Sequence, residues 1–155
     1  LNLVVRLPAG GKVSPWIEEN IPDLLKACRG PAALPVDEVD ARLAAYISRT
    51  VTVPGGEYKR RPILAGNSVH ADWFLARKFL PRFSALLHYR HLDVTALKLQ
   101  WQDWFKGEEF AKDDPARLRE FFPEAVLGAS DQRHDAYYDA QASIAELSFY
   151  RQRLT

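Results

Sequence analysis

A histidine and two aspartates are the side chains of this sequence best suited to acid–base and metal chemistry. Asp72 lies in "ILAGNSVHADWFL", and His134 and Asp139 lie in "HDAYYDAQASIAELSFYR". A carboxylate binds hard divalent cations through oxygen, and a histidine beside it can activate water as a general base. The same spacing is common in unrelated chains, and an aspartate at a helix start usually has a structural role. The alternatives are therefore a metal and general-base site or an ordinary polar helix entry.

The two carboxylates are expected at the starts of helices. A short buried strand at residues 62–66 precedes a helix at 71–89 that Pro81 interrupts, which places Asp72 in the first turn. The positive end of the helix dipole keeps a carboxylate ionised there. Residues five apart do not share a helix face, so we expect His134 in a loop and Asp139 on the last helix, which starts near residue 136. In that layout both side chains can converge on one pocket.

The rest of the chain alternates strands with helices, which predicts an α/β domain with a mixed sheet flanked by helices. Ser14 and Pro15 predict the start of the first helix, and Pro22 predicts a break in it. Thr95 is the expected N-cap of a helix at 95–105. The other expected elements are strands at 1–7 and 89–94 and helices at 14–30, 35–51 and 115–122.

Composition sets broad limits on the class of protein. The 155 residues suit one domain, 1–155, and the net charge of +1 does not by itself indicate a nucleic-acid binder. No apolar run reaches the roughly 18 residues that a membrane span needs, so no membrane partner is expected. Cys28 is the only cysteine, which excludes an intrachain disulfide and favours a reducing intracellular compartment, either cytoplasm or mitochondrion. The opening "LNLVVRLP" has the pattern of a strand entered in mid-fold, so we expect preceding residues to have been removed or not recorded.

A second group of polar residues lies in "LLHYRHLDVTALK". Arg90 and Thr95 are candidate phosphate ligands, and Tyr89 could stack on a nucleic-acid base. The alternative is a strand edge with an exposed arginine and a threonine that only caps a helix.

Three stretches together resemble one family. "AGNSVHADWFL", "HYRHLDVTALK" and "HDAYYDAQASIAELSFYR" follow one another as in oligoribonuclease, a family of DEDDh 3′–5′ exonucleases with an RNase H-like fold. The resemblance is strongest over residues 63–93 and 134–153 and weaker over 1–53, with an enlarged linker at 106–133. It implies hydrolysis of very short RNAs to mononucleotides by two Mg²⁺ or Mn²⁺ ions.

The resemblance also implies a role for each candidate residue. Asp72 and Asp139 match acidic metal ligands, and His134 matches the general base that deprotonates the water. Ser68, Arg90 and Thr95 match residues that cap the terminal phosphate of the RNA. Tyr89 matches a tyrosine that reaches across a homodimer toward the partner's substrate.

The family's Asp-x-Glu motif on the opening strand has no counterpart in this sequence. It supplies two of the four acidic ligands, and the acids of "DEVDAR" lie on an expected helix instead. Three accounts follow. The recorded sequence lacks its first strands and the intact protein is active; or the protein is an inactive homologue that binds RNA or a partner in a ribonucleoprotein assembly, with a partner covering the open sheet edge; or another chain supplies the missing strands.

Overall fold

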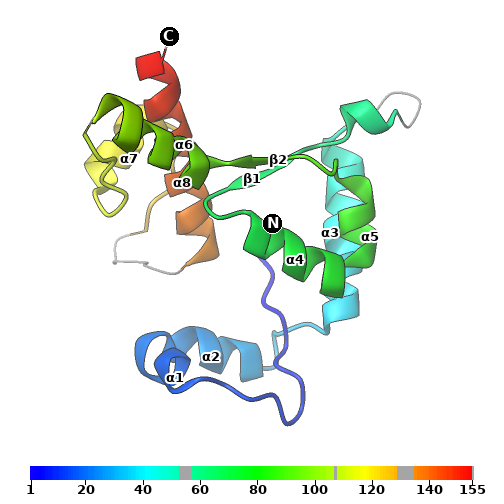
Figure 1. Ribbon diagram of the computed structural model, residues 1–155. Helices are drawn as coiled ribbons and strands as arrows, with labels where there is room; N and C mark the ends of the chain where they lie inside the picture. Colours follow the sequence, from blue (N-terminus) through cyan, green and yellow to red (C-terminus); the bar gives the residue numbers. More distant parts are fainter. Residues whose placement is uncertain (53–56, 107, 129–134, 155) are drawn as a thin grey trace. The chain divides into compact units, whose positions relative to one another are not determined.

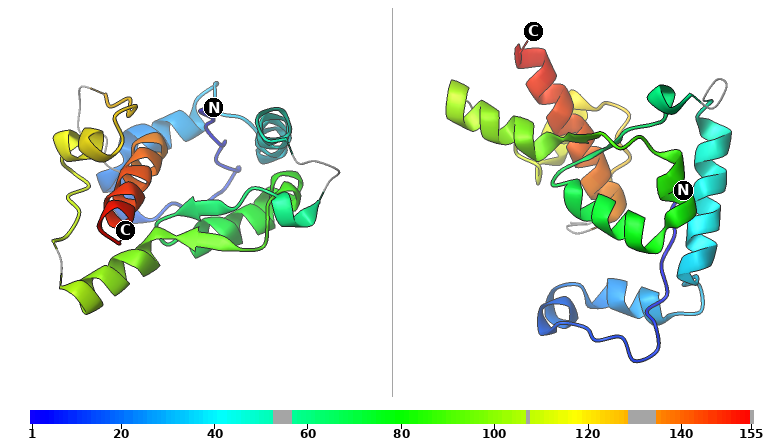
Figure 2. Two further views of the ribbon diagram at one scale, coloured as in Figure 1. Left: turned by 90° about the horizontal axis from the view of Figure 1, so that it is seen from above. Right: turned by 45° about the vertical axis from the view of Figure 1, so that its right-hand side comes forward.

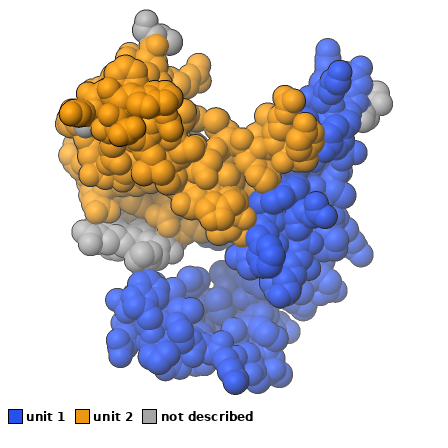
Figure 3. Space-filling view, in the orientation of Figure 1, with its two compact units in different colours: residues 1–62, 73–88 blue, residues 63–72, 89–155 orange. Residues whose placement is uncertain are grey.

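The computed structural model describes residues 1–52, 57–106, 108–128 and 135–154 (Figure 1). The chain divides into two compact units: unit 1 is residues 1–62 with 73–88, and unit 2 is residues 63–72 with 89–155 (Figure 3). The single exonuclease-like domain over 1–155, with its enlarged linker at 106–133, stays a prediction. Within the described ranges, no helix has the length and apolar character needed to cross a membrane.

Unit 1 is built from short helices, most of which begin at or directly after a proline. α1 (Pro15–Asn20) begins after the N-cap Ser14, and α2 (Pro22–Arg29) begins at the proline that was predicted to break the first helix. α3 (Val36–Thr50) follows, then a 3₁₀ turn (Tyr58–Arg60). α4 (His70–Phe79) has its first three residues in unit 2 and the rest in unit 1. α5 (Pro81–Leu86) begins after Leu80, so the predicted interruption at Pro81 is confirmed. Proline is tolerated at a helix start because the first amide has no partner within the helix.

The packing of α3 against α5 depends on a buried carboxylate. The two helices lie side by side (Figures 1 and 2). Asp40 of α3 is only 3% exposed, and its carboxylate accepts hydrogen bonds from the backbone amides of Arg82 and Phe83 at 3.0 and 2.8 Å. Asp40 therefore caps the N-terminus of α5 from a neighbouring helix, where a negative charge is favoured.

The described sheet has two strands, β1 (Leu64–Gly66) and β2 (His91–Asp93), which are parallel with Leu64 opposite His91. The described residues contain no antiparallel pair, so the mixed strand order is not seen in them. The strand predicted at 1–7 is wrong: that segment makes one isolated parallel bridge, Val5 to Leu34. A strand forms only where a neighbouring strand accepts its hydrogen bonds, and one bridge does not extend into a ladder. The RNase H-like fold stays a prediction.

Unit 2 is built around the last helix. α6 (Val94–Gln100) continues into a π-helix (Trp101–Phe105), and α7 (Pro115–Phe121) packs on α8 (Ala136–Leu154) (Figure 2). Its core consists of aliphatic and aromatic side chains from α6, α7, α8 and the segment before α7: Val94, Phe110, Leu118, Phe121, Ala142, Ala145, Phe149 and Tyr150.

The start of α6 corrects one prediction. The N-cap is Asp93, whose carboxylate accepts a hydrogen bond from the backbone amide of Thr95 at 2.9 Å. The prediction that Thr95 caps this helix is therefore wrong. The carboxylate of Asp93 satisfies the free amide, which leaves the Thr95 hydroxyl available for other contacts.

A buried charge joins the segment before α7 to α8. The side chain of Glu146 is 1% exposed; one carboxylate oxygen lies 2.7 Å from Lys112 Nζ, and the other accepts a hydrogen bond from the Tyr150 hydroxyl at 3.0 Å. Burial, with the negative charge of Glu146 close by, raises the pKa of Tyr150 above its ordinary value. The phenol therefore keeps its donor hydrogen to higher pH than an ordinary tyrosine does.

Removing the lysine should destabilise unit 2 strongly. Lys112→Met leaves the Glu146 carboxylate buried without its counter-charge, and we expect the free energy of unfolding to fall by about 3 kcal/mol. Denaturant unfolding measures this loss. Lys98→Met is the matched control, because the partner of Lys98 is Glu109, whose side chain is 61% exposed, and the loss should be smaller. Equal losses for the two variants would contradict a structural role for the buried pair.

Candidate active site

The turn after β1 holds a serine in a left-handed conformation. Ser68 has a φ of 52°, which is unfavourable for a residue with a Cβ. Its backbone amide donates hydrogen bonds to Asp93 Oδ1 at 3.0 Å and to Thr95 Oγ1 at 2.9 Å. Its hydroxyl lies 3.3 Å from the hydroxyl of Thr95. The hydroxyls of Ser68 and Thr95, both predicted to bind phosphate, are therefore brought together.

The carboxylate of Asp93 lies at the centre of this turn. Oδ1 accepts from the backbone amides of Ser68 and Thr95, and Oδ2 lies 3.8 Å from Nδ1 of His70, the first residue of α4. The side chain of His70 is 79% exposed, so this contact faces solvent. One carboxylate thus joins the segment after β1, the end of β2 and the start of α6.

The two predicted metal ligands lie in the first turns of different helices. Asp72 is exposed in the first turn of α4, and Asp139 is exposed in the first turn of α8, as predicted. α8 is capped by Asp135, whose carboxylate accepts from the backbone amides of Tyr137 and Tyr138 at 2.9 and 3.0 Å. The prediction that "HDAYYD" contains a polar helix start is therefore confirmed. His134, the predicted general base, lies outside the described residues.

An asparagine connects the turn after β1 with α8. Asn67 Nδ2 donates to the hydroxyl of Ser143 at 2.8 Å, and Asn67 Oδ1 accepts from the hydroxyl of Thr95 at 3.2 Å. The Ser143 hydroxyl donates in turn to the carbonyl oxygen of Asp139 at 2.9 Å. A continuous path of hydrogen bonds therefore runs from the predicted phosphate-binding hydroxyls to the helical turn that carries Asp139.

Tyr89 and Arg90 contact each other. Nε of Arg90 donates to the hydroxyl of Tyr89 at 3.3 Å, and the guanidinium carbon lies 5.7 Å from the centre of the Tyr89 ring. Both side chains are exposed, and Tyr89 is 58% exposed. They are accessible to a ligand, as a base-stacking and phosphate-binding pair requires.

The described residues do not by themselves form a complete metal site. Among them, no group of three or more histidine, cysteine, aspartate or glutamate side chains is placed to hold a metal ion. Asp72 and Asp139 offer the hard oxygen donors that Mg²⁺ and Mn²⁺ prefer, yet divalent cations of this kind take six or more ligands. The two Mg²⁺ or Mn²⁺ ions that the resemblance implies stay a prediction.

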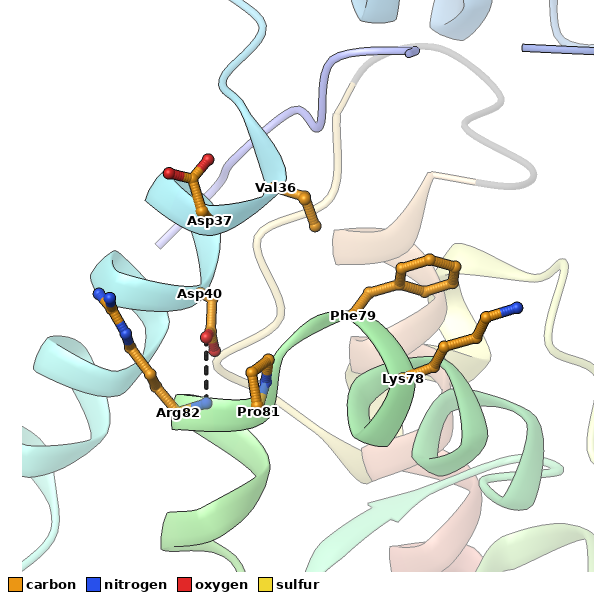
Figure 4. A pocket seen from close by; sticks show the side chains of 7 residues that line it. All are labelled: Val36, Asp37, Asp40, Lys78, Phe79, Pro81 and Arg82. Atoms are coloured by element: carbon orange, nitrogen blue, oxygen red, sulfur yellow. Dashed lines mark hydrogen bonds between the residues drawn. The ribbon is translucent and has the colours of Figure 1, made fainter.

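Unit 1 contains a hollow of about 370 Å³, which offers an alternative site (Figure 4). Its lining mixes acidic, basic and apolar side chains: Val36, Asp37, Asp40, Lys78, Phe79, Pro81 and Arg82. The carboxylate of Asp40 is already occupied by backbone amides of α5, as the close-up shows for Arg82. None of the residues predicted for the site lines this hollow, so the chemistry of the sequence points to unit 2 instead.

Sequence reasoning missed three residues that organise the site. Asp93 carried a usable signal, because aspartate between a strand and a helix is a strong N-cap candidate. Asn67 and Ser143 carried none, since they lie 76 positions apart and only the fold brings them together.

The left-handed turn at Ser68 predicts an order of stability. Ser68→Ala keeps the strain and loses the hydroxyl contact to Thr95, whereas Ser68→Gly loses the same contact but relieves the strain. We expect the glycine variant to be more stable than the alanine variant by about 1 kcal/mol, measured by denaturant unfolding. An alanine variant equal to or more stable than the glycine variant would mean that Ser68 is not held in this conformation.

The amino-acid sequence is similar to those of two known proteins. An oligoribonuclease of Francisella tularensis subsp. novicida is 38% identical over 97 residues, which are 63% of this chain and 44% of the relative. An oligoribonuclease of Tropheryma whipplei is 31% identical over 121 residues, which are 77% of this chain and 53% of the relative. The chain thus spans about half the length of these curated relatives, and no protein-family model matches it. These relatives confirm the resemblance to the oligoribonuclease family that the three motifs predicted.

Proposed function

We propose that the protein is a 3′–5′ exoribonuclease that hydrolyses short oligoribonucleotides to mononucleotides. The observation that supports the proposal is a set of hydrogen bonds in unit 2, the junction, in which Asn67 connects Thr95 with Ser143. It places the Ser68 and Thr95 hydroxyls at one end of a path that reaches the helical turn of Asp139. This junction lies in a chain 31–38% identical to proteins named oligoribonuclease.

In this proposal the exposed polar groups of unit 2 hold the ends of a short RNA. The Ser68 and Thr95 hydroxyls and the Arg90 guanidinium lie around the terminal phosphate in this proposal. Ser68 and Arg90 donate to its oxygens, and Thr95, whose own hydrogen goes to Asn67, holds the Ser68 turn in place. The exposed ring of Tyr89 stacks on a base. A homodimer in which Tyr89 reaches the partner's RNA is part of the proposal, and a monomer in light scattering would remove it.

The hydrolytic chemistry is assigned to the carboxylates and the histidine. Asp72 and Asp139 would contribute oxygen ligands to divalent cations, and His134 would accept the proton of the attacking water. The described residues do not complete a site for two cations, so an active enzyme needs acidic ligands in addition to Asp72 and Asp139. Support for Asp139 as a functional group comes from its exposure in the first turn of a capped helix.

The incomplete acidic set favours a second candidate function. A protein with the phosphate-binding hydroxyls, Arg90 and Tyr89 but too few metal ligands would bind short RNA or a partner in a ribonucleoprotein assembly without cleaving it. Both functions use the same binding residues. Only an enzyme should lose turnover when a carboxylate is replaced.

A nuclease assay separates the two functions. The full-length gene product is incubated with Mn²⁺ and a labelled 5′-phosphorylated diribonucleotide, and released mononucleotide is measured. We expect Asp139→Asn and His134→Ala to lower kcat by at least about 100-fold, because a metal ligand or a general base is lost. Asp103→Asn, which changes an exposed aspartate of the π-helix, is the matched control and should not lower kcat. Equal and negligible release by wild type and variants would favour the binding function.

Substrate preference tests the phosphate contact. Arg90→Ala should lower kcat/KM for a 5′-phosphorylated diribonucleotide by about tenfold or more, because a charge-assisted hydrogen bond is lost. The 5′-hydroxyl form should lose much less, since it lacks the phosphate. Arg119→Ala, at an exposed position of α7, is the control. An equal loss for both substrates would assign Arg90 a role other than phosphate binding.

A further inference from the structure

We infer that Asn67 is a positioning residue that holds the phosphate-binding hydroxyls of the site in register with the helical turn of Asp139. The inference rests on the proposed function, because it concerns the geometry of that same site. Asn67 would touch neither RNA nor water at the scissile bond, and it would act through Ser143 on one side and Thr95 on the other.

The contacts of Asn67 span three segments of unit 2. The side chain follows β1, is half-buried, and uses both ends of its amide. The nitrogen donates to Ser143 on α8 at 2.8 Å, and the oxygen accepts from Thr95 on α6 at 3.2 Å. A single planar group therefore links α6 to α8.

The donors and acceptors along this path fit only one arrangement. The Ser143 hydroxyl gives its one hydrogen to the carbonyl oxygen of Asp139, so its remaining capacity is as an acceptor, and the Asn67 nitrogen fills it. The Thr95 oxygen already accepts from the Ser68 amide, and its own hydrogen goes to the Asn67 oxygen. The position therefore needs a donor and an acceptor in one short side chain, which asparagine supplies.

No residue of similar size replaces both functions of Asn67. Aspartate offers two acceptors and no donor, so the nitrogen's bond to Ser143 would be lost. Alanine leaves the Thr95 hydroxyl without its acceptor and Ser143 without its donor. Loosening the path would allow the phosphate-binding hydroxyls and the Asp139 turn to shift independently, which raises KM and lowers kcat together, because small displacements of reacting groups are costly.

A double-mutant cycle between Asn67→Ala and Ser143→Ala tests the inference in the full-length protein. We expect each single change to lower kcat/KM for the 5′-phosphorylated diribonucleotide by about 10- to 100-fold. This is the usual effect of removing a residue that orients a functional group without contacting the substrate. The double variant should lose no more than the worse single variant, because both changes break the same path. Ser143→Thr, which keeps a hydroxyl able to bond the Asp139 carbonyl, should recover most of the Ser143→Ala loss.

Matched controls come from unit 1. Asn20→Ala removes an amide that donates to the Trp16 carbonyl at 2.8 Å, and Ser84→Ala removes a hydroxyl that donates to the Pro81 carbonyl at 3.2 Å. These variants lose the same chemical groups and one hydrogen bond each, without touching the path. All assays are made at a temperature where thermal unfolding shows every variant to be folded.

A second measurement separates failure of the inference from failure of the proposed function. Calorimetry gives the dissociation constant of the 5′-phosphorylated diribonucleotide without added metal, and Asn67→Ala should weaken binding by about threefold to tenfold. If wild type does not cleave but Asn67→Ala still weakens binding, the exonuclease function fails and the positioning role stands. If wild type cleaves while Asn67→Ala behaves like Asn20→Ala, or the losses in the double variant multiply, the positioning role is overturned. If wild type neither cleaves nor binds, both are overturned.

Discussion

The carboxylate of Asp93 is the interaction on which the candidate site depends. One of its oxygens accepts two backbone amides, those of Ser68 and Thr95, from segments that follow different strands. A serine at φ 52° is held against a steric penalty of about 1 kcal/mol or more, so something must compensate for it. The shared carboxylate and the Thr95 oxygen supply that compensation. Without them the turn would relax, and the Ser68 hydroxyl would leave Thr95.

The site is organised by short polar side chains, whereas the helix that carries Asp139 is held by an apolar core. α8 buries Ala142, Ala145, Phe149 and Tyr150 against α6, α7 and the segment before α7. Buried aromatic packing of this kind supplies stability but little directional precision. The hydrogen bonds of Asn67 and Ser143 supply the direction, because they fix donor and acceptor positions within a few tenths of an ångström. The stability of α8 therefore comes from its apolar side chains, whereas its position relative to Asn67 is fixed by the hydroxyl of Ser143.

The sequence predicted the helices of this chain better than it predicted the sheet or the supports of the site. Prolines and caps are local signals, so the starts of α1, α2 and α5 could be placed from residues within a few positions. The segment 1–7 has strand-like residues, but a strand also requires a partner strand, and the sequence cannot show that the described segment forms one isolated bridge, from Val5 to Leu34. Thr95 was predicted to cap α6 because threonine is a good cap, but aspartate is one too, and the backbone places Asp93 at the cap position.

The described hydrogen bonds of the junction are made between protein groups. Asp72 and Asp139 lie at the starts of different helices, where the helix dipole tolerates a negative charge without a cation. The turn at Ser68 and the path through Asn67 are closed by hydrogen bonds among uncharged groups and one carboxylate. The hydrogen bonds of this junction therefore do not depend on how many acidic ligands the proposed site has. The junction is therefore compatible with both proposed functions, which differ in the acidic ligands that they require around Asp72 and Asp139.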